Sequence, residues 1–239
     1  MQTGSEVIEH EPGDLTCIVE GGIRLSTLQS VLDAHGQRLS LDPPGDPTLA
    51  ECLTGDLSGP LRHRFGTMRD LVLGVTVVLP DGMRANSGGK VVKNVAGYDL
   101  GKLFCGSRGR LGSVERLALR LHPLPTAART VVTSADWRAL HDSQLVPSAV
   151  DIADGLMHVL FEGSPRAVDA QLHALGGEEC DPWADLRSLQ LSLPGRVRWD
   201  GKSAPLVRPG PRVAYVEEAR TSVWSPLAER VVEALCSPS

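Results

Sequence analysis

The sequence predicts an α+β fold made of two consecutive parts. Short apolar runs typical of strands alternate with short amphipathic stretches typical of helices along the 239 residues. The 25 glycines and 17 prolines predict many tight turns and argue against a simple helical bundle. Two prolines in the segment 122–125 block both helix and sheet pairing, so we expect a boundary between domains 1–125 and 126–239.

The first part is expected to alternate strands with short helices. The spacing of Ser26 and Gln29 predicts a capping box that opens a helix, with Leu28, Val31 and Leu32 as its apolar face and a stop at His35-Gly36. The turn at 80–82 predicts a hairpin, because proline presets φ and glycine accepts positive φ. Strands are expected at 15–20, 37–41, 71–79, 83–87 and 112–121, and Asp99 is expected to cap a short helix that runs to Phe104.

The second part has a different order of elements. A serine cap followed by proline at Ser164-Pro165 is a strong helix start. Strands are expected at 129–133, 148–153, 156–161 and 211–216, and helices at 135–143, 165–175, 182–190 and 223–235. The β-α-β-β-α order predicts a small ferredoxin-like sandwich.

Composition excludes several classes of protein. A formal net charge of −5 offers no general attraction to nucleic acid or to an anionic membrane, and only 4% of the residues are aromatic. The five cysteines are scattered, and the seven histidines show no metal-ligand spacing, so neither a disulfide framework nor a metal site is expected. We find no apolar run long enough to span a bilayer and no signal peptide.

Glycine and basic residues concentrate in the segment 84–112. This segment contains six lysines and arginines and a single acidic residue, Asp99. The excess of positive charge suggests a site for a small anionic ligand, and a solvent-exposed loop would explain it equally well. Residues 106–112 follow a G-x-x-G-x-x-G pattern, in which backbone N–H groups can approach a ligand closely. The pattern fits neither the P-loop nor the Rossmann motif, and the glycines can also serve turns alone.

Four segments together make the sequence recognisable: 70–82, 88–100, 106–112 and 119–125. They resemble the FAD-binding (E-type) subunit of bacterial glycolate oxidase, which is a PCMH-type flavoprotein of the vanillyl-alcohol oxidase group. The resemblance runs from about residue 6 to residue 162 and is weaker beyond. It implies that residues 1–125 form a partial FAD-binding domain that lacks the N-terminal phosphate-loop subdomain, and that residues 126–239 form a cap domain.

The resemblance also implies contacts to FAD. Carried over by position, the cofactor-binding residues are Pro44, Gly45, Ser58, Gly59, Gly66, Gly106, Gly109, Leu111 and Gly112. Lys90, Lys93, Asn94, Tyr98 and Asp99 match the same family, with a structural or subunit-contact role as open as a cofactor contact. No catalytic residue is assigned, and His63 is expected to be an exposed loop residue rather than a general base.

The function implied is the FAD-binding subunit of a 2-hydroxy-acid (glycolate-type) oxidase or dehydrogenase complex. Its partners are a second flavoprotein subunit and an iron–sulfur subunit, its substrate is a small 2-hydroxy acid, and its location is cytoplasmic, with attachment to the inner membrane through partners left open. The alternative is a truncated, non-catalytic paralogue that serves as a structural subunit of such a complex. A start codon upstream of Met1 is a third reading.

Glu51 stands where the family has a glycine near the flavin. Burial of an unpaired carboxylate costs several kcal/mol, as much as several good hydrogen bonds contribute. Three alternatives are therefore open: Glu51 points to solvent, it pairs with Arg62 or Arg64, or it excludes the cofactor.

Overall fold

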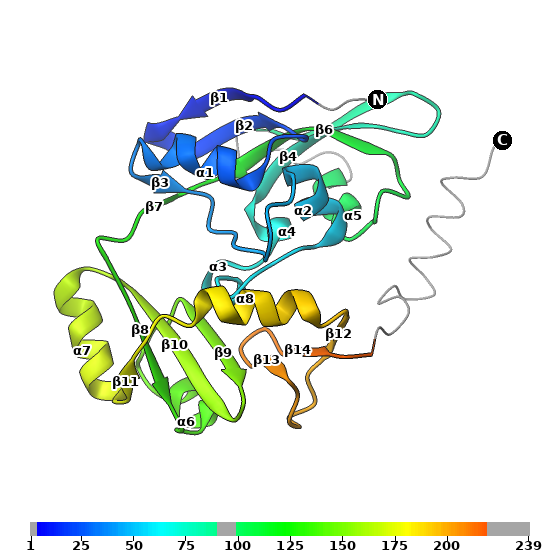
Figure 1. Ribbon diagram of the computed structural model, residues 1–239. Coiled ribbons are helices and arrows are strands. Elements are labelled where there is room, and N and C mark those ends of the chain that lie inside the picture. Colours follow the sequence, from blue (N-terminus) through cyan, green and yellow to red (C-terminus); the bar gives the residue numbers. More distant parts are fainter. Residues whose placement is uncertain (1–3, 90–98, 219–239) are drawn as a thin grey trace. The chain divides into compact units, whose positions relative to one another are not determined.

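The computed structural model describes residues 4–89 and 99–218, and the chain divides into two units (Figure 1). Among the described residues, unit 1 contains 4–58, 66–89 and 99–124, and unit 2 contains 59–65 and 125–218. The predicted α+β class is confirmed. The assignment of 1–125 as a flavin domain and 126–239 as a cap stays a prediction, and the helix expected at 223–235 lies outside the described residues.

Unit 1 is built on a five-stranded antiparallel sheet with strand order β1-β2-β6-β4-β5. Alternate residues of its strands face the core: Cys17 and Val19 on β2 and Leu117 and Leu119 on β6 are fully buried. Its strands are β1 (Val7–Glu11), β2 (Thr16–Glu20), β4 (Val72–Val78), β5 (Arg84–Gly88) and β6 (Ser113–Arg120), and a second sheet pairs β3 (Gln37–Arg38) with β7 (His122–Pro123). The predicted β4–β5 hairpin is confirmed.

Short helices pack against this sheet (Figure 1). They are α1 (Leu25–Asp33), α2 (Leu49–Gly55), α4 (Met68–Leu71) and α5 (Leu100–Phe104), with a 3₁₀ turn, η1, at Pro12–Asp14. Leu28, Leu32, Leu53, Met68 and Phe104 are among their fully or almost fully buried side chains. Asp99 caps α5 as predicted, by accepting a hydrogen bond from the N–H of Lys102.

Three predictions for unit 1 were wrong in detail. Ser26 does not cap its helix with Gln29: its N–H and hydroxyl both donate to the carboxylate of Asp46, and Gln29 binds the backbone of Leu39 instead. Val31 is exposed, because the buried face of α1 consists of Leu25, Leu28 and Leu32 and does not extend to Val31. Of the strand expected at 37–41, only Gln37–Arg38 is paired.

Unit 2 holds a seven-stranded antiparallel sheet with strand order β11-β8-β10-β9-β13-β14-β12. Its strands are β8 (Ala127–Thr133), β9 (Ala149–Ala153), β10 (Leu156–Gly163), β11 (Glu178–Glu179), β12 (Gly195–Arg198), β13 (Leu206–Arg208) and β14 (Val213–Val216), and its helices are α3 (Arg62–Phe65), α6 (Trp137–His141), α7 (Pro165–Leu175) and α8 (Trp183–Ser192). Strands β8 to β11, which lie in the order β11-β8-β10-β9, have the arrangement of a ferredoxin-like sandwich, as predicted. The sheet is then extended by β13, β14 and β12, of which only β14 was foreseen.

The two faces of this sheet are covered by different helices. On β9, Val150 packs in a cluster with residues of α6 and α7, whereas Ala149 and Ala153 pack in a cluster with residues of α8. Side chains alternate between faces along a strand, so α8 covers the face opposite to α6 and α7. Ser164 caps α7 as predicted.

Candidate functional site

The loop at 42–45 leads directly into α2, and this places two predicted cofactor contacts beside the start of that helix. Pro44 is half-buried, and Gly45 is exposed with φ +77°. A Cβ built at Gly45 would meet nothing within 4 Å, so a ligand has room to approach the backbone here.

Glu51 is used to cap α2. Its Oε2 accepts hydrogen bonds from Thr48 N (2.7 Å) and Thr48 Oγ1 (3.0 Å), and its own N–H donates to Thr48 Oγ1. The backbone hydrogen bond from Thr48 lowers the pKa of the Glu51 carboxyl below its ordinary value of 4.5. Glu51 is exposed, so of the three alternatives the first holds: its carboxylate is no buried obstacle to a cofactor.

The glycine loop 106–112 lies against the other end of α2. The N–H groups of Gly106 and Arg108 donate to the carbonyls of Leu53 (3.0 Å) and Thr54 (2.8 Å), the last turn of that helix. Further along the loop, Arg110 N donates to Ser107 O and Gly112 N to Gly109 O. Most backbone donors of the loop are therefore used inside the protein, and the expected nest of free N–H groups is not formed.

Two side-chain hydroxyls in or near these loops are left without a hydrogen-bond partner. Ser107 in this loop and Ser40 just before the loop at 42–45 are both fully buried, and neither Oγ has a hydrogen-bond partner. A buried hydroxyl left unpaired costs on the order of 1–3 kcal/mol. At Gly109, with φ +75°, a Cβ would again meet nothing within 4 Å. Two unpaired hydroxyls and two open glycines thus lie in or next to the loops 42–45 and 106–112.

Two further predicted glycines, Gly112 and Gly66, have packing reasons. At Gly112 (φ +127°) a Cβ would lie 2.2 Å from the carbonyl oxygen of Val78 on β4. At Gly66 (φ +80°) it would lie 2.4 Å from the carboxylate of Asp70, which caps α4 by accepting from Thr67 N. Leu111 is buried in the core of unit 1. Gly112, Gly66 and Leu111 are thus explained by the fold, and their contact with a cofactor stays a prediction.

Ser58 and Gly59 lie where the chain passes from one unit to the other. Ser58 is 2% exposed and belongs to unit 1, and Gly59 is buried and belongs to unit 2. His63, in the segment that follows, is half-buried, contrary to the exposed position expected from the sequence. Burial lowers the pKa of His63, so its imidazole is neutral at pH 7.

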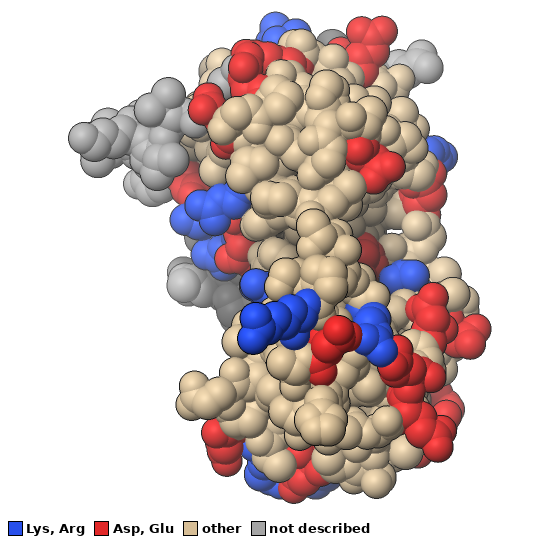
Figure 2. All heavy atoms as spheres, turned by 90° about the vertical axis from the view of Figure 1, so that its left-hand side faces the viewer, with Lys and Arg blue, Asp and Glu red and all other residues tan. Residues whose placement is uncertain are grey.

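The basic concentration at 84–110 is partly neutralised by nearby acids. Arg84 pairs with Glu115 at 2.6 Å, and Lys102 pairs with Asp99 at 2.9 Å. Figure 2 shows the face on the left-hand side of Figure 1, away from this segment, and there basic and acidic side chains are also interspersed. Lys90, Lys93, Asn94 and Tyr98 lie outside the described residues.

A buried charged network in unit 2 was missed by the sequence analysis. Arg208 on β13 and Asp151 on β9 are both fully buried, with Arg208 Nε 2.9 Å from Asp151 Oδ1. Arg208 also donates to Tyr215 Oη (2.6 Å) and Gln190 Oε1 (2.7 Å). Burial raises the pKa of Asp151, and the adjacent guanidinium opposes that effect. The signal was present: Asp151 is a charged residue at an inward position of an otherwise apolar strand.

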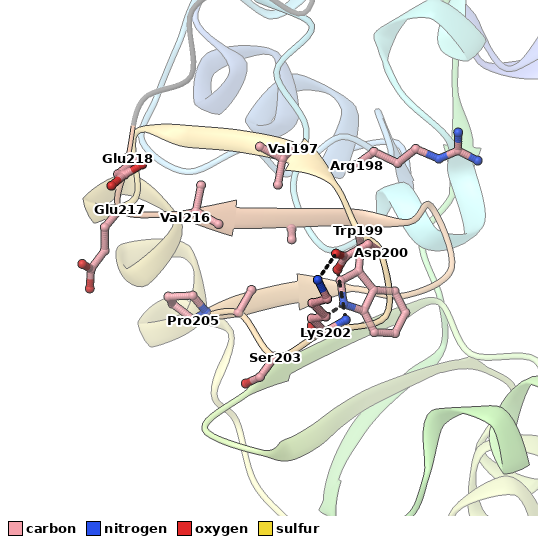
Figure 3. A pocket seen from close by; sticks show the side chains of 12 residues that line it. Val197, Arg198, Trp199, Asp200, Lys202, Ser203, Pro205, Val216, Glu217 and Glu218 are labelled. Carbon is pink, nitrogen blue, oxygen red and sulfur yellow. Dashed lines mark hydrogen bonds and ion pairs between the residues drawn. The ribbon is translucent and has the colours of Figure 1, made fainter.

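A cavity of about 500 Å³ opens at the β12 end of the same sheet (Figure 3). Its apolar wall includes Val197, Val216 and Pro205, and Glu217 and Glu218 lie together at one end of it. It contains none of the predicted cofactor residues.

Other kinds of chemistry find little support among the described residues. Burial raises the pKa of Cys17, Cys52 and Cys105 to about 12, so these thiols are unreactive at pH 7. Within 4–89 and 99–218, no three histidine, cysteine or acidic residues gather as metal ligands. Of the helices in these ranges, none has the length and apolar character to cross a membrane.

Comparison with known proteins relates this chain, rather than particular residues of it, to an FAD-binding family. Residues 1–87 match the family described as FAD binding domain. The chain is 33% identical over 206 residues to glycolate oxidase subunit GlcE of Escherichia coli (strain K12), covering 80% of this chain and 59% of that protein. It is 29% identical over 195 residues to the mitochondrial D-lactate dehydrogenase [cytochrome] 1 of Saccharomyces cerevisiae, covering 80% of this chain and 32% of that protein.

The fold has relatives among solved structures. Two structures of an alkyldihydroxyacetonephosphate synthase superpose with TM-scores of 0.59 and 0.61 at 19% identity, covering 72% and 77% of this chain and 39% and 46% of theirs. At that identity the likeness concerns the fold alone. The resemblance found in the sequence is confirmed, and the chain spans less than two thirds of the length of each of these curated relatives.

Proposed function

Because residues 1–87 belong to the family of FAD binding domains, we propose that this chain is the FAD-binding subunit of an oxidase or dehydrogenase complex for a small 2-hydroxy acid such as glycolate. The observation that carries the proposal is the 33% identity to a glycolate oxidase subunit over 80% of the chain. D-lactate dehydrogenases among the relatives support the same substrate class.

The described residues fit a flavin nucleotide through side chains more than through backbone donors. In the proposal, the hydroxyls of Ser107 and Ser40 bind its polar groups, and Gly45 and Gly109 leave room for its close approach. The further proposed contacts are Pro44, Ser58, Gly59, Gly66, Gly106, Leu111 and Gly112. When bound, FAD supplies the redox chemistry, and the protein supplies binding and orientation.

The proposed partners are a second flavoprotein subunit and an iron–sulfur subunit. A glycolate oxidase subunit GlcD of Bacillus subtilis is also among the relatives, at 34% identity over 134 residues, which supports a complex of related flavin subunits. We place the complex in the cytoplasm, with its partners as the route to any contact with the inner membrane. No residue of this chain is assigned as the substrate base.

The second candidate function is that of a non-catalytic assembly subunit. The observation that favours it is the glycine loop, whose backbone donors at Gly106, Arg108, Arg110 and Gly112 are used internally. Such a subunit keeps the fold and lacks the cofactor.

Purification of the complex and separation of its subunits distinguishes the two functions. The proposal predicts that FAD is released in part from this chain and that 2-hydroxy-acid-dependent reduction of a dye requires it. If all flavin follows the partner subunits while the chain is still needed for their assembly, the assembly role is correct.

A further inference from the structure

Strand β12 forms one edge of the seven-stranded sheet of unit 2. It pairs with β14 on one side, and among residues 4–89 and 99–218 no strand pairs with its other, outer side. Trp199 N donates to Arg212 O at 2.8 Å, so positions 199 and 212 form a hydrogen-bonded pair. Such pairs alternate along an antiparallel ladder, and the backbone N–H and C=O of Arg198 therefore point away from β14. A further strand could bind these two groups.

The cavity of about 500 Å³ adjoins this edge of the sheet (Figure 3). Val213 and Tyr215 on β14 pack in the cluster with α8. Ala214 and Val216 therefore point to the opposite face, where both line the cavity. Val197 on β12 pairs with Ala214 and lines the cavity as well. The apolar cluster of α6 and α7 on this face includes none of the three, so in the described part of the chain they border a cavity.

The charge around the cavity is acidic at one end. Glu217 and Glu218 are both exposed there (Figure 3). The basic residues that line the cavity do not balance them: Lys202 pairs with Asp200 at 3.4 Å, and the Arg198 side chain extends away from the two glutamates (Figure 3). Complementary charge favours an occupant that is basic at this end and apolar where it meets the valines.

We propose that the outer side of β12 and this cavity bind an extended segment of a partner protein, which adds to the sheet as a further strand. Each pairing in the sheet is antiparallel, so we expect the added strand to run antiparallel to β12. Its C-terminal end then lies beside Glu217 and Glu218, because Gly195, the first residue of β12, pairs with Val216.

This orientation defines the sequence that the surface recognises. Side chains of an added strand alternate between the two faces of the sheet. The segment therefore carries aliphatic residues at alternate positions, which enter the cavity, followed by lysine or arginine at its C-terminal end. The inference does not depend on FAD binding, so its failure would leave the proposed function standing.

Two labelled synthetic peptides of identical composition test the proposal with the purified full chain, by fluorescence anisotropy. One peptide has alternating valine and threonine followed by two lysines, and the other has the two lysines first; both have blocked ends. The peptide with C-terminal lysines should bind saturably and about fivefold or more tighter than the other. Failure of that peptide to bind, or an affinity no higher than that of the other peptide, would overturn the proposal.

Two substitutions of Arg198 separate its backbone from its side chain. Arg198→Pro removes the outward N–H, at a position where an edge strand tolerates proline, and should weaken binding of the peptide about fivefold. Arg198→Ala keeps the N–H and should retain most of the affinity. Urea unfolding verifies that both variants are folded. Equal losses in the two variants would show that the backbone of the edge is not used and would overturn the proposal.

The acidic end is tested by the double variant Glu217→Gln with Glu218→Gln, which does not alter the strand. It should weaken binding of the lysine-ended peptide about fivefold and reduce the dependence of binding on salt. Glu178→Gln is the matched control, because Glu178 is an exposed glutamate on β11, at the other edge of the same sheet. Its affinity should equal that of the wild type. Equal affinities of the double variant and the control would contradict the proposal.

A second copy of this chain is the alternative occupant of the edge. Gel filtration of the full chain without peptide distinguishes the two. The proposal predicts the same elution volume for the wild type and Arg198→Pro. A wild-type dimer that Arg198→Pro converts to a monomer would show that the edge pairs with a second copy, and would overturn the assignment to a partner protein.

Discussion

At the scale of single residues, the informative side chains are those that the fold leaves without a partner. Ser107 and Ser40 are fully buried, and their hydroxyls bind nothing in the protein. Such a group does not stabilise the fold, since removal of an unpaired buried hydroxyl has a neutral or favourable effect on the free energy of unfolding. Their retention is explained if a ligand completes their hydrogen bonds.

Ser107→Ala should therefore have opposite effects on stability and on binding. Without FAD, the free energy of unfolding should stay equal or rise by about 1 kcal/mol, because an unpaired hydroxyl is removed. With FAD, the variant should bind more weakly than the wild type. Urea unfolding of the apo chain and FAD titration measure the two effects.

Thr130→Val is the control for Ser107→Ala. Its hydroxyl is buried but accepts a hydrogen bond from Trp183 Nε1 at 2.7 Å, so this variant should lose stability. If Ser107→Ala destabilises the apo chain as Thr130→Val does, the hydroxyl of Ser107 is structural and the argument for a ligand there fails.

At the scale of elements, α2 joins the two loops that carry the proposed cofactor contacts. Its first turn is closed by the Thr48–Glu51 capping box, and its last turn accepts hydrogen bonds from Gly106 and Arg108. A helix of seven residues rises only about 10 Å, so the two loops lie close to each other along its length. A substitution at the start of α2 is therefore expected to affect both loops.

Thr48→Ala should cost about 1 kcal/mol of unfolding free energy, because it removes the N-cap hydroxyl. Glu51 adds a pH dependence. Its pKa is lowered in the folded state, so its stabilising effect is present above its ordinary value of 4.5 and is lost as the pH falls through the lower folded value. Urea unfolding from pH 3 to 7 should show a smaller acid-dependent loss in Thr48→Ala, and equal pH profiles would contradict the role of the cap.

The network around Arg208 holds four elements of unit 2 together. Asp151 on β9, Arg208 on β13, Tyr215 on β14 and Gln190 on α8 are joined by hydrogen bonds of 2.6 to 3.2 Å. This network links α8, β13 and β14 to β9, beside the apolar cluster that the same elements share.

Asp151→Ala should cost about 3–5 kcal/mol, because it leaves the Arg208 guanidinium buried without its counter-charge. The double variant Asp151→Leu with Arg208→Met should be more stable than this single variant, since no charge is left buried. Arg129→Ala serves as control: its ion pairs with Asp169 and Glu179 are exposed, so its loss of stability should be much smaller than that of Asp151→Ala. Tryptophan fluorescence during urea unfolding reports the result, and a single variant as stable as the double would contradict it.

Local rules explain which elements the sequence could predict. The β4–β5 hairpin, the Asp99 cap and the Ser164-Pro165 helix start depend on neighbouring residues, and each was found where the sequence placed it. The capping box was predicted at Ser26 and occurs at Thr48, because Asp46, distant along the chain from Ser26, takes both of its donors. A hydrogen bond to a residue that is distant in the sequence cannot be predicted from the residues next to Ser26.

At the scale of the whole molecule, long sequence motifs predicted the FAD-binding family, whereas the proposed contacts of Ser107 and Ser40 rest on their burial in the folded chain. Resemblance supplied Gly45 and Gly109, which are open to a ligand, together with Gly66 and Gly112, which have packing reasons. Ser107 lies within the 106–112 motif but was not among the predicted contacts, and neither was Ser40, because burial without a partner is a property of the folded chain. The passage of Gly59–Phe65 into unit 2 was equally invisible in the sequence.

The central claim, that this chain itself holds FAD, is tested most directly by visible spectroscopy of the purified full chain titrated with FAD. The account predicts saturable binding, with flavin bands that co-elute with the chain on gel filtration and are shifted from those of free FAD. Free FAD that separates completely from the chain at every protein concentration tested would contradict it.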